Sequence, residues 1–327
     1  MKTLLEISTL EEIKSPSVFY YPESRKEVDI TTLEDDFINW LETTPNTIET
    51  YKRAIRVFFT YLKDKGIQNP TREDLKNYRN YLLETRKPTT TASYINALKQ
   101  FYSFMEYKGY APDITHHLKG AKVSTRIHRK EPLTLSQARD ILASSPRDTL
   151  EEKRNYALLL LLLTSGMRTI EVVRADIKDL VYQCGYLSLN IWGKGRQEKD
   201  RYTKLPYNVE KAINDYLNAR GENSPDAPLF SSVSDRNNGG RLTTRSISRI
   251  VKASYRRIGL DNPLFTAHST RHFVASELIK SGKPIEEVAE QLGHTNTNTT
   301  KIYIHALDRA KLDNEETLSN LLLKEAI

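Results

Sequence analysis

Four short segments of the sequence carry residue types that can act on a phosphate group. In chain order they are Ser165-Gly166-Met167-Arg168, Gly193-Lys194-Gly195-Arg196, His268-Ser269-Thr270-Arg271-His272, and the pair Leu292-Gly293-His294 and Thr300-Lys301-Ile302-Tyr303-Ile304-His305. Each segment alone is weak evidence, because a single arginine is by default a surface ion-pair residue and the chain has 18 tyrosines. The interpretation therefore depends on the segments taken together.

Nucleotide-binding and metal-binding motifs explain these segments poorly. The run around Lys194 lacks the glycine spacing and the Lys-Ser/Thr ending of a phosphate-binding loop. His268 and His272 have zinc-helix spacing, but no glutamate stands between them. His116 and His117 are neighbours, and neighbours on a helix do not share a face. We expect no metal site.

Two arginines, a lysine, histidines and a tyrosine together suit a phosphodiester, whose transition state spreads negative charge over the non-bridging oxygens. Paired guanidinium groups can hold these oxygens with two hydrogen bonds each. A tyrosine hydroxyl can attack phosphorus as a covalent nucleophile, and a lysine or histidine can protonate the departing oxygen. No cluster of metal-binding carboxylates accompanies them in the sequence. We therefore expect metal-free phosphoryl transfer without a cofactor.

The charge of the chain favours a polyanionic partner. Lysine and arginine number 49 and aspartate and glutamate 42, which gives a net charge of +7. Residues 119–130 hold five basic side chains and residues 236–257 hold seven, and neither stretch holds an acid. Such stretches fit a polyanion, and on charge alone a solvated basic face is an equal alternative.

Composition excludes several classes of protein. One cysteine in 327 residues excludes a disulfide scaffold. The longest apolar run, residues 157–163, is far shorter than the roughly 20 residues of a membrane span. The first residues lack a long apolar signal region. We expect a soluble cytoplasmic protein with no membrane partner.

The elements that would position these residues fall into two groups. Helices are predicted near 32–42, from a capping box at 46–49 to Gly66, from a capping box at 71–74, and from Pro88 to Gly109. The basic, aperiodic segment 112–132 is typical of a linker. A second domain begins with a capping box at 134–137, and its apolar helix 154–164 indicates central core.

The second domain also contains a hairpin and further helices. Period-two alternation predicts a strand at 186–192, a turn at 193–195 and a returning strand at 201–206. Further helices are expected at 208–220, 244–258, 270–281, 284–292 and 297–307. The fold class is mainly α with a small antiparallel β-sheet, in two domains.

The chain resembles the tyrosine recombinase (phage integrase) family. The family pattern has Thr-Gly-Leu-Arg with an acid three residues later, a lysine in a hairpin turn, His-x-Leu-Arg-His, Leu-Gly-His, and a tyrosine nine residues after that last histidine. The matching positions are Arg168 with Glu171, Lys194, His268 with Arg271, His294 and Tyr303. The departures are Ser165, Met167 and Thr270, which neighbour these positions. Five elements in the right order and spacing are a specific signal, and with the helical domain the resemblance covers nearly the whole chain beyond residue 30.

The resemblance implies a role for each matched residue. Tyr303 attacks the scissile phosphate and forms a 3′-phosphotyrosyl bond, while Arg168 and Arg271 clamp the non-bridging oxygens. His268 and His294 hydrogen-bond the phosphate, and His268 is favoured as the proton acceptor. Lys194 protonates the 5′-oxygen that leaves. Glu171 supports its neighbours, and His272 and His305 are left out of the site.

The resemblance also implies an architecture, a two-domain DNA clamp of a SAM-like core-binding domain and an integrase-type catalytic domain. The expected boundaries are an extension at 1–30, a core-binding domain at 31–113, a basic linker at 114–131, a catalytic domain at 132–310 and a tail at 311–327. We expect the leucine-rich tail to be exchanged between protomers, with packing on its own domain as the alternative. The acidic residues 1–30 suggest a Xer-like or simple integrase without an arm-binding domain.

Double-stranded DNA with specific recombination sites is the expected partner. Four copies would exchange strands through a four-way junction, with accessory or activating proteins as further partners. The expected DNA contacts are Arg241, Arg245 and Arg249 on one helix face, Arg126 and Lys130 in the linker, and basic residues on the second and fourth helices. Such a protein would act in the cytoplasm at the nucleoid.

Two other functions remain open from the sequence. A type IB topoisomerase-like enzyme uses similar chemistry but reseals the same strand as a monomer, and the leucine-rich tail argues against it. A non-catalytic DNA-binding relative would not need every catalytic position intact. Integration or excision of a mobile element, dimer resolution and inversion share one chemistry, so the sequence does not separate them.

Overall fold

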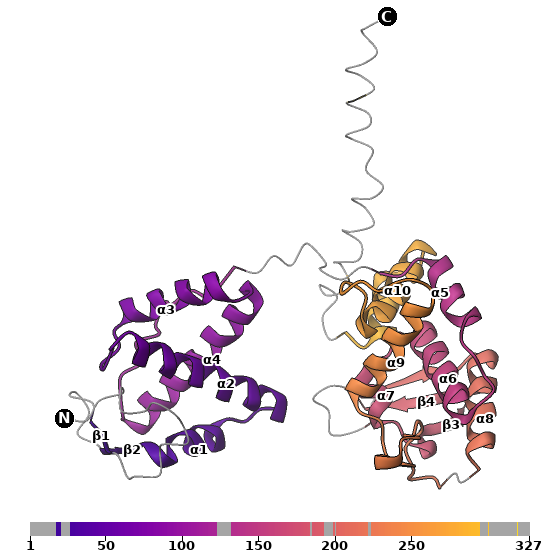
Figure 1. Ribbon diagram of the computed structural model, residues 1–327, viewed down its shortest axis with the longest axis horizontal. Coiled ribbons are helices and arrows are strands. Elements are labelled where there is room, and N and C mark those ends of the chain that lie inside the picture. The colour runs from indigo at the N-terminus through magenta and orange to yellow at the C-terminus, as the bar shows by residue number, and fades with distance from the viewer. Residues whose placement is uncertain are drawn as a thin grey trace, which may run out of the picture. The chain divides into compact units, whose positions relative to one another are not determined.

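A computed structural model describes residues 18–20, 27–122, 132–183, 185–192, 199, 201–221, 224–294, 300 and 319. The chain divides into two compact units, Met1–Ser124 and Thr125–Ile327. In Figure 1 the first unit runs from indigo to purple and the second from magenta to yellow.

The first unit contains the four helices that the sequence predicts, and a short antiparallel strand pair that it does not. The helices are α1 (Ile30–Trp40), α2 (Pro45–Asp64), α3 (Arg72–Thr85) and α4 (Pro88–Lys108), and the strands are β1 (Val18–Tyr20) and β2 (Glu27–Asp29). Capping defines the ends: the Thr71 and Asp74 side chains bond each other's backbone N–H, and Gly109 ends α4 with a φ of 70°. The capping box expected at 46–49 is wrong, because Thr44 caps α2 two residues earlier.

Aromatic side chains fill the core of the first unit. Phe37 and Phe58 are each 1% exposed and Phe104 is fully buried. The rings of Phe37 and Phe101 meet edge to face, with centroids 5.4 Å apart. The apolar stripes read from the sequence are therefore packing surfaces, as expected.

The second unit is also mostly helical. Its elements are α5 (Leu135–Ala143), α6 (Leu150–Ser165), α7 (Thr169–Arg174), η2 (Ile177–Asp179), β3 (Leu180–Gln183), β4 (Tyr186–Ile191), β5 (Arg201–Lys204), α8 (Tyr207–Arg220), η3 (Asp235–Asn237), α9 (Thr244–Arg257), α10 (Ala267–Lys280) and α11 (Ile285–Leu292). The mainly α class with a small antiparallel sheet is confirmed. The sequence did not predict α7 and β3, which are six and four residues long.

α6 is the centre of the second unit, as its apolar run predicts. Leu158 and Leu162 are fully buried, and the helix packs against both α8 and α10. The sheet has the order β3-β4-β5, and in its register Leu189 of β4 faces Leu180 on one side and Thr203 on the other. Among the described residues, no helix is long and apolar enough to cross a membrane.

Part of the prediction falls on residues that the structure does not describe. The expected helix 297–307 and the tail 311–327 lie outside the described residues, apart from Thr300 and Ser319. The hairpin turn 193–198 and the second half of the basic linker, 123–131, lie outside them too. The site below is built from the residues on either side of these segments.

Candidate active site

Arg168 lies where one helix ends and the next begins. α6 stops at Gly166, whose φ of 67° is the left-handed conformation that glycine adopts without strain. Arg168 then takes the N-cap position of α7. The carboxylate of Glu171 accepts hydrogen bonds from the backbone N–H of Arg168 at 2.7 Å and from its Nη1 at 2.9 Å. The three-residue spacing thus sets a buried carboxylate against this arginine.

Arg271 reaches the same turn from α10. It is only 1% exposed, which is unusual for a cation unless its donors are satisfied. Nη1 donates to the carbonyl oxygen of Gly166 at 2.8 Å, and Nη2 donates to the carbonyl oxygen of Leu292. The buried guanidinium therefore connects the glycine turn after α6 to the end of α11.

The two guanidinium groups meet at the carboxyl end of α11. Arg168 donates from Nη2 to the carbonyl oxygen of Gly293 at 3.2 Å and from Nη1 to that of Leu292 at 3.5 Å, and Arg271 also donates to Leu292. Carbonyls at this end carry the negative pole of the helix dipole, which favours cations. Because these carbonyls are neutral, they hold the arginines without cancelling their charge.

His294 follows this turn directly. Burial is the largest cause that lowers its pKa to about 3, and the positive charges of Arg271 and Arg168 lower it further. The imidazole is therefore neutral at pH 7. Its Nδ1 lies 2.8 Å from Oγ1 of Thr300. A neutral imidazole held by a hydroxyl at one ring nitrogen keeps the other nitrogen for a ligand.

His268 and His272 differ in exposure, as the sequence interpretation assumed. His268 is exposed in the first turn of α10, and His272 is 3% exposed. Their rings meet edge to face with centroids 4.6 Å apart. The charge of His268 also contributes to the lowered pKa of His294, so the two lie within electrostatic range of each other.

Some of the expected site residues are brought together and others are not described. Three segments far apart in the sequence converge on one turn through the side chains of Arg168, Glu171, Arg271, His268 and His294. The remaining expected residues lie outside the described residues: Lys194, Tyr303, Arg126 and Lys130. Thr300, three residues before Tyr303 in the sequence, is helical and fully buried.

Arg201 also lies at this site, and the sequence analysis missed it. It stands on β5, and its Nη2 lies 3.1 Å from Oε2 of Glu171. Its Nη1 donates to the carbonyl oxygen of Gln291 at 2.6 Å. In the sequence it is one basic residue among several after the hairpin turn, so its position is visible only once the strand is folded.

The basic stretch 236–257 is less free than its composition suggests. Arg241 precedes α9 rather than lying on it, so the prediction of one helix face with Arg245 and Arg249 is wrong. Its guanidinium donates to the carbonyl oxygens of Val173 and Ala175, at 2.7 and 3.2 Å, and pairs with Asp176 at 2.5 Å. The cause is the N-cap at Thr243, whose hydroxyl accepts a hydrogen bond from the backbone N–H of Ser246. The helix therefore begins at Thr244, three residues after Arg241.

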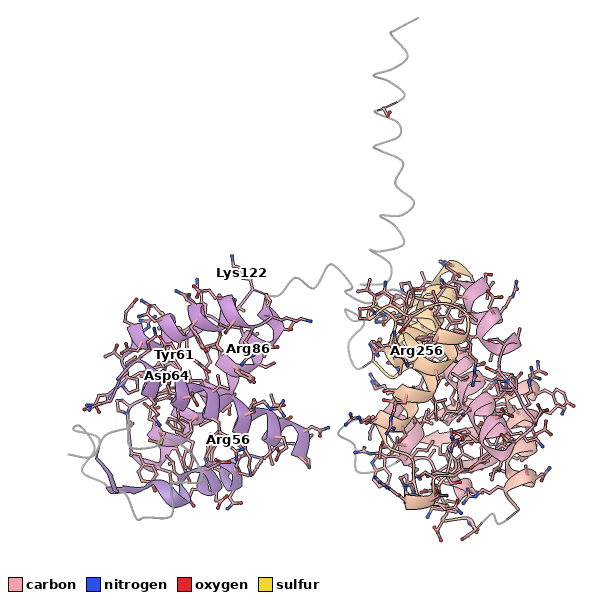
Figure 2. All side chains as sticks on the ribbon, viewed as in Figure 1. Arg56, Tyr61, Asp64, Arg86, Lys122 and Arg256 are labelled. Atoms are coloured by element: carbon pink, nitrogen blue, oxygen red, sulfur yellow. The ribbon has the colours of Figure 1, made fainter. Side chains whose placement is uncertain are left out.

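Acids from other segments neutralise further cations of α9. Asp261 pairs with Lys252 at 3.4 Å and with Arg256, which is labelled in Figure 2, at 3.2 Å. Arg249 and Arg257 line a shallow pocket together with Glu151, Glu152 and neighbouring residues of α6. Arg245 is exposed at the start of the helix. Of the three arginines proposed from the sequence, Arg245 is therefore the best placed for a phosphate.

Two basic residues of α2 are likewise engaged. Arg56, which is labelled in Figure 2, pairs with Glu34 of α1 at 3.1 Å, and Lys52 lies 3.9 Å from the same carboxylate. Exposed pairs of this kind exchange partners at little cost, since each stabilises the fold by about 0–1 kcal/mol.

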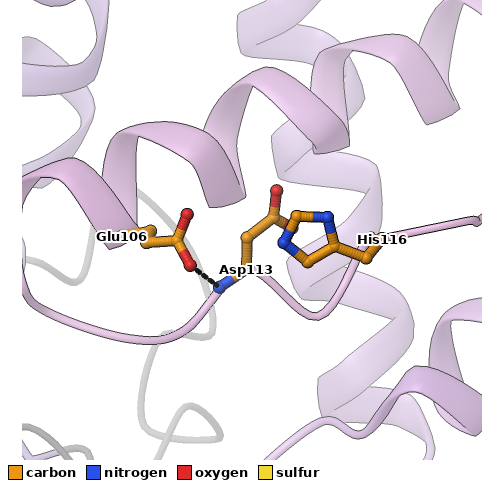
Figure 3. Close-up of side chains that lie close together, drawn as sticks. All are labelled: Glu106, Asp113 and His116. Carbon is orange, nitrogen blue, oxygen red and sulfur yellow. Dashed lines mark hydrogen bonds between the residues drawn. The ribbon is translucent and has the colours of Figure 1, made fainter.

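One group of possible metal ligands occurs among the described residues, in the first unit. Glu106, Asp113 and His116 have ligand atoms within 4.8 Å of one another (Figure 3). The carboxylates already have structural partners: Glu106 accepts from the backbone N–H of Asp113 at 3.2 Å, and Asp113 accepts from both the N–H and the hydroxyl of Thr115. These bonds close the turn that follows α4 and account for the cluster.

Comparison with family models gives two matches. Residues 131–309 match the model described as "Phage integrase family". Residues 35–109 match "Phage integrase, N-terminal SAM-like domain". The first match alone spans more than half of the chain.

Relatives of known name are similar over most of their length. A protein of Rhizobium meliloti named "Tyrosine recombinase XerD" is 29% identical over 273 residues, covering 80% of this chain and 86% of its own. "Tyrosine recombinase XerC" of Herpetosiphon aurantiacus is 30% identical over 285 residues, covering 82% and 87%.

Solved structures share the fold. XerH recombinase in a post-cleavage complex with a palindromic difH substrate matches with a TM-score of 0.69 at 19% identity, covering 97% of this chain and 95% of its own. A lambda integrase tetramer bound to a Holliday junction matches with a TM-score of 0.64 at 15% identity, covering 86% and 78%.

Proposed function

The chain belongs to the phage integrase family, and on that premise we propose how it breaks and rejoins DNA. It is a tyrosine recombinase, a site-specific recombinase of DNA. The further steps below are our proposal for how its own residues perform the reaction.

Two arginines hold the scissile phosphate in this proposal. The observation that carries it is the convergence of Arg168 and Arg271 on the turn 292–294. Both guanidinium groups donate to neutral carbonyls there, and the carboxylate of Glu171 that also pairs with Arg168 is shared with Arg201. A net positive charge therefore remains for the non-bridging oxygens. Such preorganised donors stabilise charge that develops in a transition state. Glu171 keeps Arg168 in place without reaching the phosphate itself.

Tyr303 is the nucleophile. Its oxygen attacks phosphorus, the bond from phosphorus to the 5′-oxygen breaks, and a 3′-phosphotyrosyl bond forms. Tyr303 follows Thr300 by three residues, and Thr300 bonds His294, which supports placing the nucleophile beside the clamp. The phosphotyrosyl bond conserves the energy of the diester, so rejoining to a new 5′-hydroxyl needs no nucleotide cofactor.

Three side chains handle protons and the remaining phosphate contacts. His294 is neutral because its pKa is lowered to about 3, so it binds as a hydrogen-bond donor rather than as a cation. His268, which is exposed at the start of α10, accepts the proton of Tyr303. Lys194 protonates the 5′-oxygen that leaves. This assigns different roles to two histidines whose environments differ.

The substrate is double-stranded DNA with specific sites, bound by four copies of the chain. Two rounds of strand exchange through a four-way junction would recombine two duplexes. The fold shared with recombinases solved on DNA, one of them a tetramer on a Holliday junction, supports this arrangement. We propose that it takes place at the nucleoid, in the cytoplasm, with accessory proteins selecting the sites, and that Arg126 and Lys130 contact DNA from the linker.

A trapping assay with nicked DNA tests the mechanism. Labelled genomic duplexes nicked near candidate sites lose a short piece after cleavage and cannot be rejoined, so an intermediate accumulates. With EDTA present, the parent protein should form a covalent protein–DNA band, and Tyr303→Phe should bind DNA without forming it. Tyr207→Phe is the matched control, because Tyr207 is 74% exposed and has no role in the proposal.

The outcomes separate the alternatives. An adduct that survives in Tyr303→Phe, or that requires Mg²⁺, contradicts the mechanism. If the parent protein binds DNA specifically but forms no adduct, the result favours the alternative of a non-catalytic DNA-binding relative. If the parent protein relaxes supercoiled plasmids that lack a recombination site, the result favours the alternative of a type IB topoisomerase-like enzyme.

A further inference from the structure

Arg201 joins elements that the proposed reaction needs but that are far apart in the sequence. It is the first residue of β5, the strand that returns from the loop holding Lys194. Its Nη2 lies 3.1 Å from the fully buried carboxylate of Glu171, and its Nη1 donates at 2.6 Å to the carbonyl oxygen of Gln291. Its side chain is 17% exposed. One guanidinium therefore contacts both the support of Arg168 and the end of α11.

The same side chain explains the glycine before His294. Gly293 has a φ of 62°, and a Cβ built on it would lie 2.8 Å from both Cζ and Nε of Arg201. Real Cβ atoms essentially never come so close, so the guanidinium packs directly on the backbone of this turn. Two independent causes thus require glycine there: the left-handed backbone and the contact with Arg201.

We propose that Arg201 is a positioning residue for the cleavage reaction, acting on Arg168 through Glu171 and on His294 through the turn 291–293. The inference rests on the proposed function for its catalytic meaning. Arg201 touches no reacting atom in this scheme.

Arg201 shares the negative charge of Glu171 with Arg168. Oε1 of Glu171 accepts from Nη1 of Arg168, and Oε2 accepts from its backbone and faces Arg201. One carboxylate thus serves two guanidinium groups. Without Arg201 the full negative charge of Glu171 would act on Arg168 alone and weaken its attraction for the phosphate.

The guanidinium of Arg201 also has the shape needed to contact two groups at once. Lysine could meet the carboxylate of Glu171, but its single ammonium cannot span Glu171 and the carbonyl of Gln291 with the planar fork that arginine provides. Loss of that span frees the turn that carries Gly293 and His294. Arg201 also adds to the positive charges that lower the pKa of His294.

A neighbouring lysine provides the matched control. Lys199 anchors the same side of the hairpin, through Asp179 and, at 3.7 Å, Asp176. Among the described residues, Lys199 interacts with Asp176, Asp179 and the ring of Trp192, and not with Glu171, Gln291 or Gly293. Lys199→Met therefore weakens the strand without touching the proposed couplings.

The first experiment compares adduct formation by Arg201→Met, Arg201→Lys and Lys199→Met. We expect Arg201→Met to slow cleavage about 100-fold, the size of effect that a misplaced catalytic group produces, with DNA affinity within about threefold of the parent. Arg201→Lys should recover part of the rate, and Lys199→Met should slow it less than tenfold. Equal losses in Arg201→Met and Lys199→Met would overturn the proposal.

DNA with a 5′-bridging sulfur at the scissile phosphate separates the two ways in which β5 could matter. A thiolate leaves without a proton, so this substrate restores variants whose only defect lies in Lys194. Arg201→Met should stay slow on it, because its defect lies in Arg168 and His294. Full recovery would overturn the proposal.

A stability cycle tests the contacts without any reaction. Gly293→Ala should lower the unfolding midpoint more in the parent than in Arg201→Ala, because the shorter side chain removes the contact with the new Cβ. Equal shifts in both backgrounds would overturn the inference. If the parent itself forms no adduct, the proposed function fails, while this cycle still decides whether Arg201 holds the turn.

Discussion

Gly166→Ala should damage the fold and the site together. Gly166 ends α6 with a φ of 67°, and a Cβ built there would lie 2.6 Å from Cδ2 of Leu292 and 3.3 Å from the side chain of Val274. Leu292 supplies a carbonyl that holds both arginines. Pushing Leu292 away therefore moves their shared acceptor.

The expected cost follows from two terms. A left-handed alanine costs about 1–2 kcal/mol, and overpacking a closed core costs about 1–3 kcal/mol. Together they predict a loss of about 2–5 kcal/mol in the free energy of unfolding. Gly282→Ala is the matched control in the same unit, because Gly282 has a φ of 81° and nothing within 4 Å of its built Cβ. It should lose about 1–2 kcal/mol.

Urea unfolding followed by tryptophan fluorescence measures the difference. The chain has 2 tryptophans, and Trp40 lies in the first unit and Trp192 in the second. In a Trp40→Phe background the signal reports the second unit alone. If Gly166→Ala is no more destabilising than Gly282→Ala, the contact with Leu292 has been misread.

Three further predictions concern charge. Arg271→Lys should keep DNA binding but slow adduct formation by about 10²–10³-fold in the trapping assay, because one ammonium cannot bond both carbonyls and a phosphate; an unimpaired rate would contradict the clamp. The pKa of His294 is lowered from 6.5 to about 3 in the folded protein. Between these two pH values the unfolded chain binds a proton at this imidazole that the folded chain does not bind. The free energy of unfolding should therefore fall as the pH drops from 6.5 towards 3, by at most about 1.4 kcal/mol per pH unit. Unfolding of His294→Gln across the same pH range should lack this part of the slope. Arg245→Ala should weaken DNA binding and reduce its dependence on salt, whereas Arg241→Ala should mainly lower stability; the reverse result in salt-titrated binding and urea unfolding would contradict their placement.

Helix positions followed from the sequence where the signals are local. Caps, glycine stops and apolar periods act within a few residues, so α3 and α4 begin close to where Thr71 and Pro88 indicate. β3 was missed because four residues show too little alternation to separate a strand from a loop. Its identity comes from pairing with β4.

The site could be predicted only in part, because some of its contacts join residues that are distant in the sequence. The spacing of Arg168 and Glu171 is local, and the structure gives it a cause in the cap of α7. Arg201 contacts residues that are distant in the sequence, so no local pattern marks it. Arg241 was misinterpreted because its spacing of four residues from Arg245 was taken as helical, although the helix expected at 244–258 begins after it, as α9 does. The basic run 236–257 was also misinterpreted, since Asp261, which pairs with Lys252 and Arg256, lies outside that run.

The turn at the end of α11 also governs when the chain can become active. Arg168 bonds carbonyls 124 and 125 positions away along the chain, and Arg271 bonds one 105 positions away. Contacts between such remote segments form late, after local helices, because a long loop must close first. During synthesis, a chain that has not yet emerged as far as Leu292 has neither of these carbonyl acceptors for Arg168. The polypeptide therefore acquires the proposed phosphate clamp only when nearly all of it has been made, and products truncated before that point lack the carbonyls that hold Arg168.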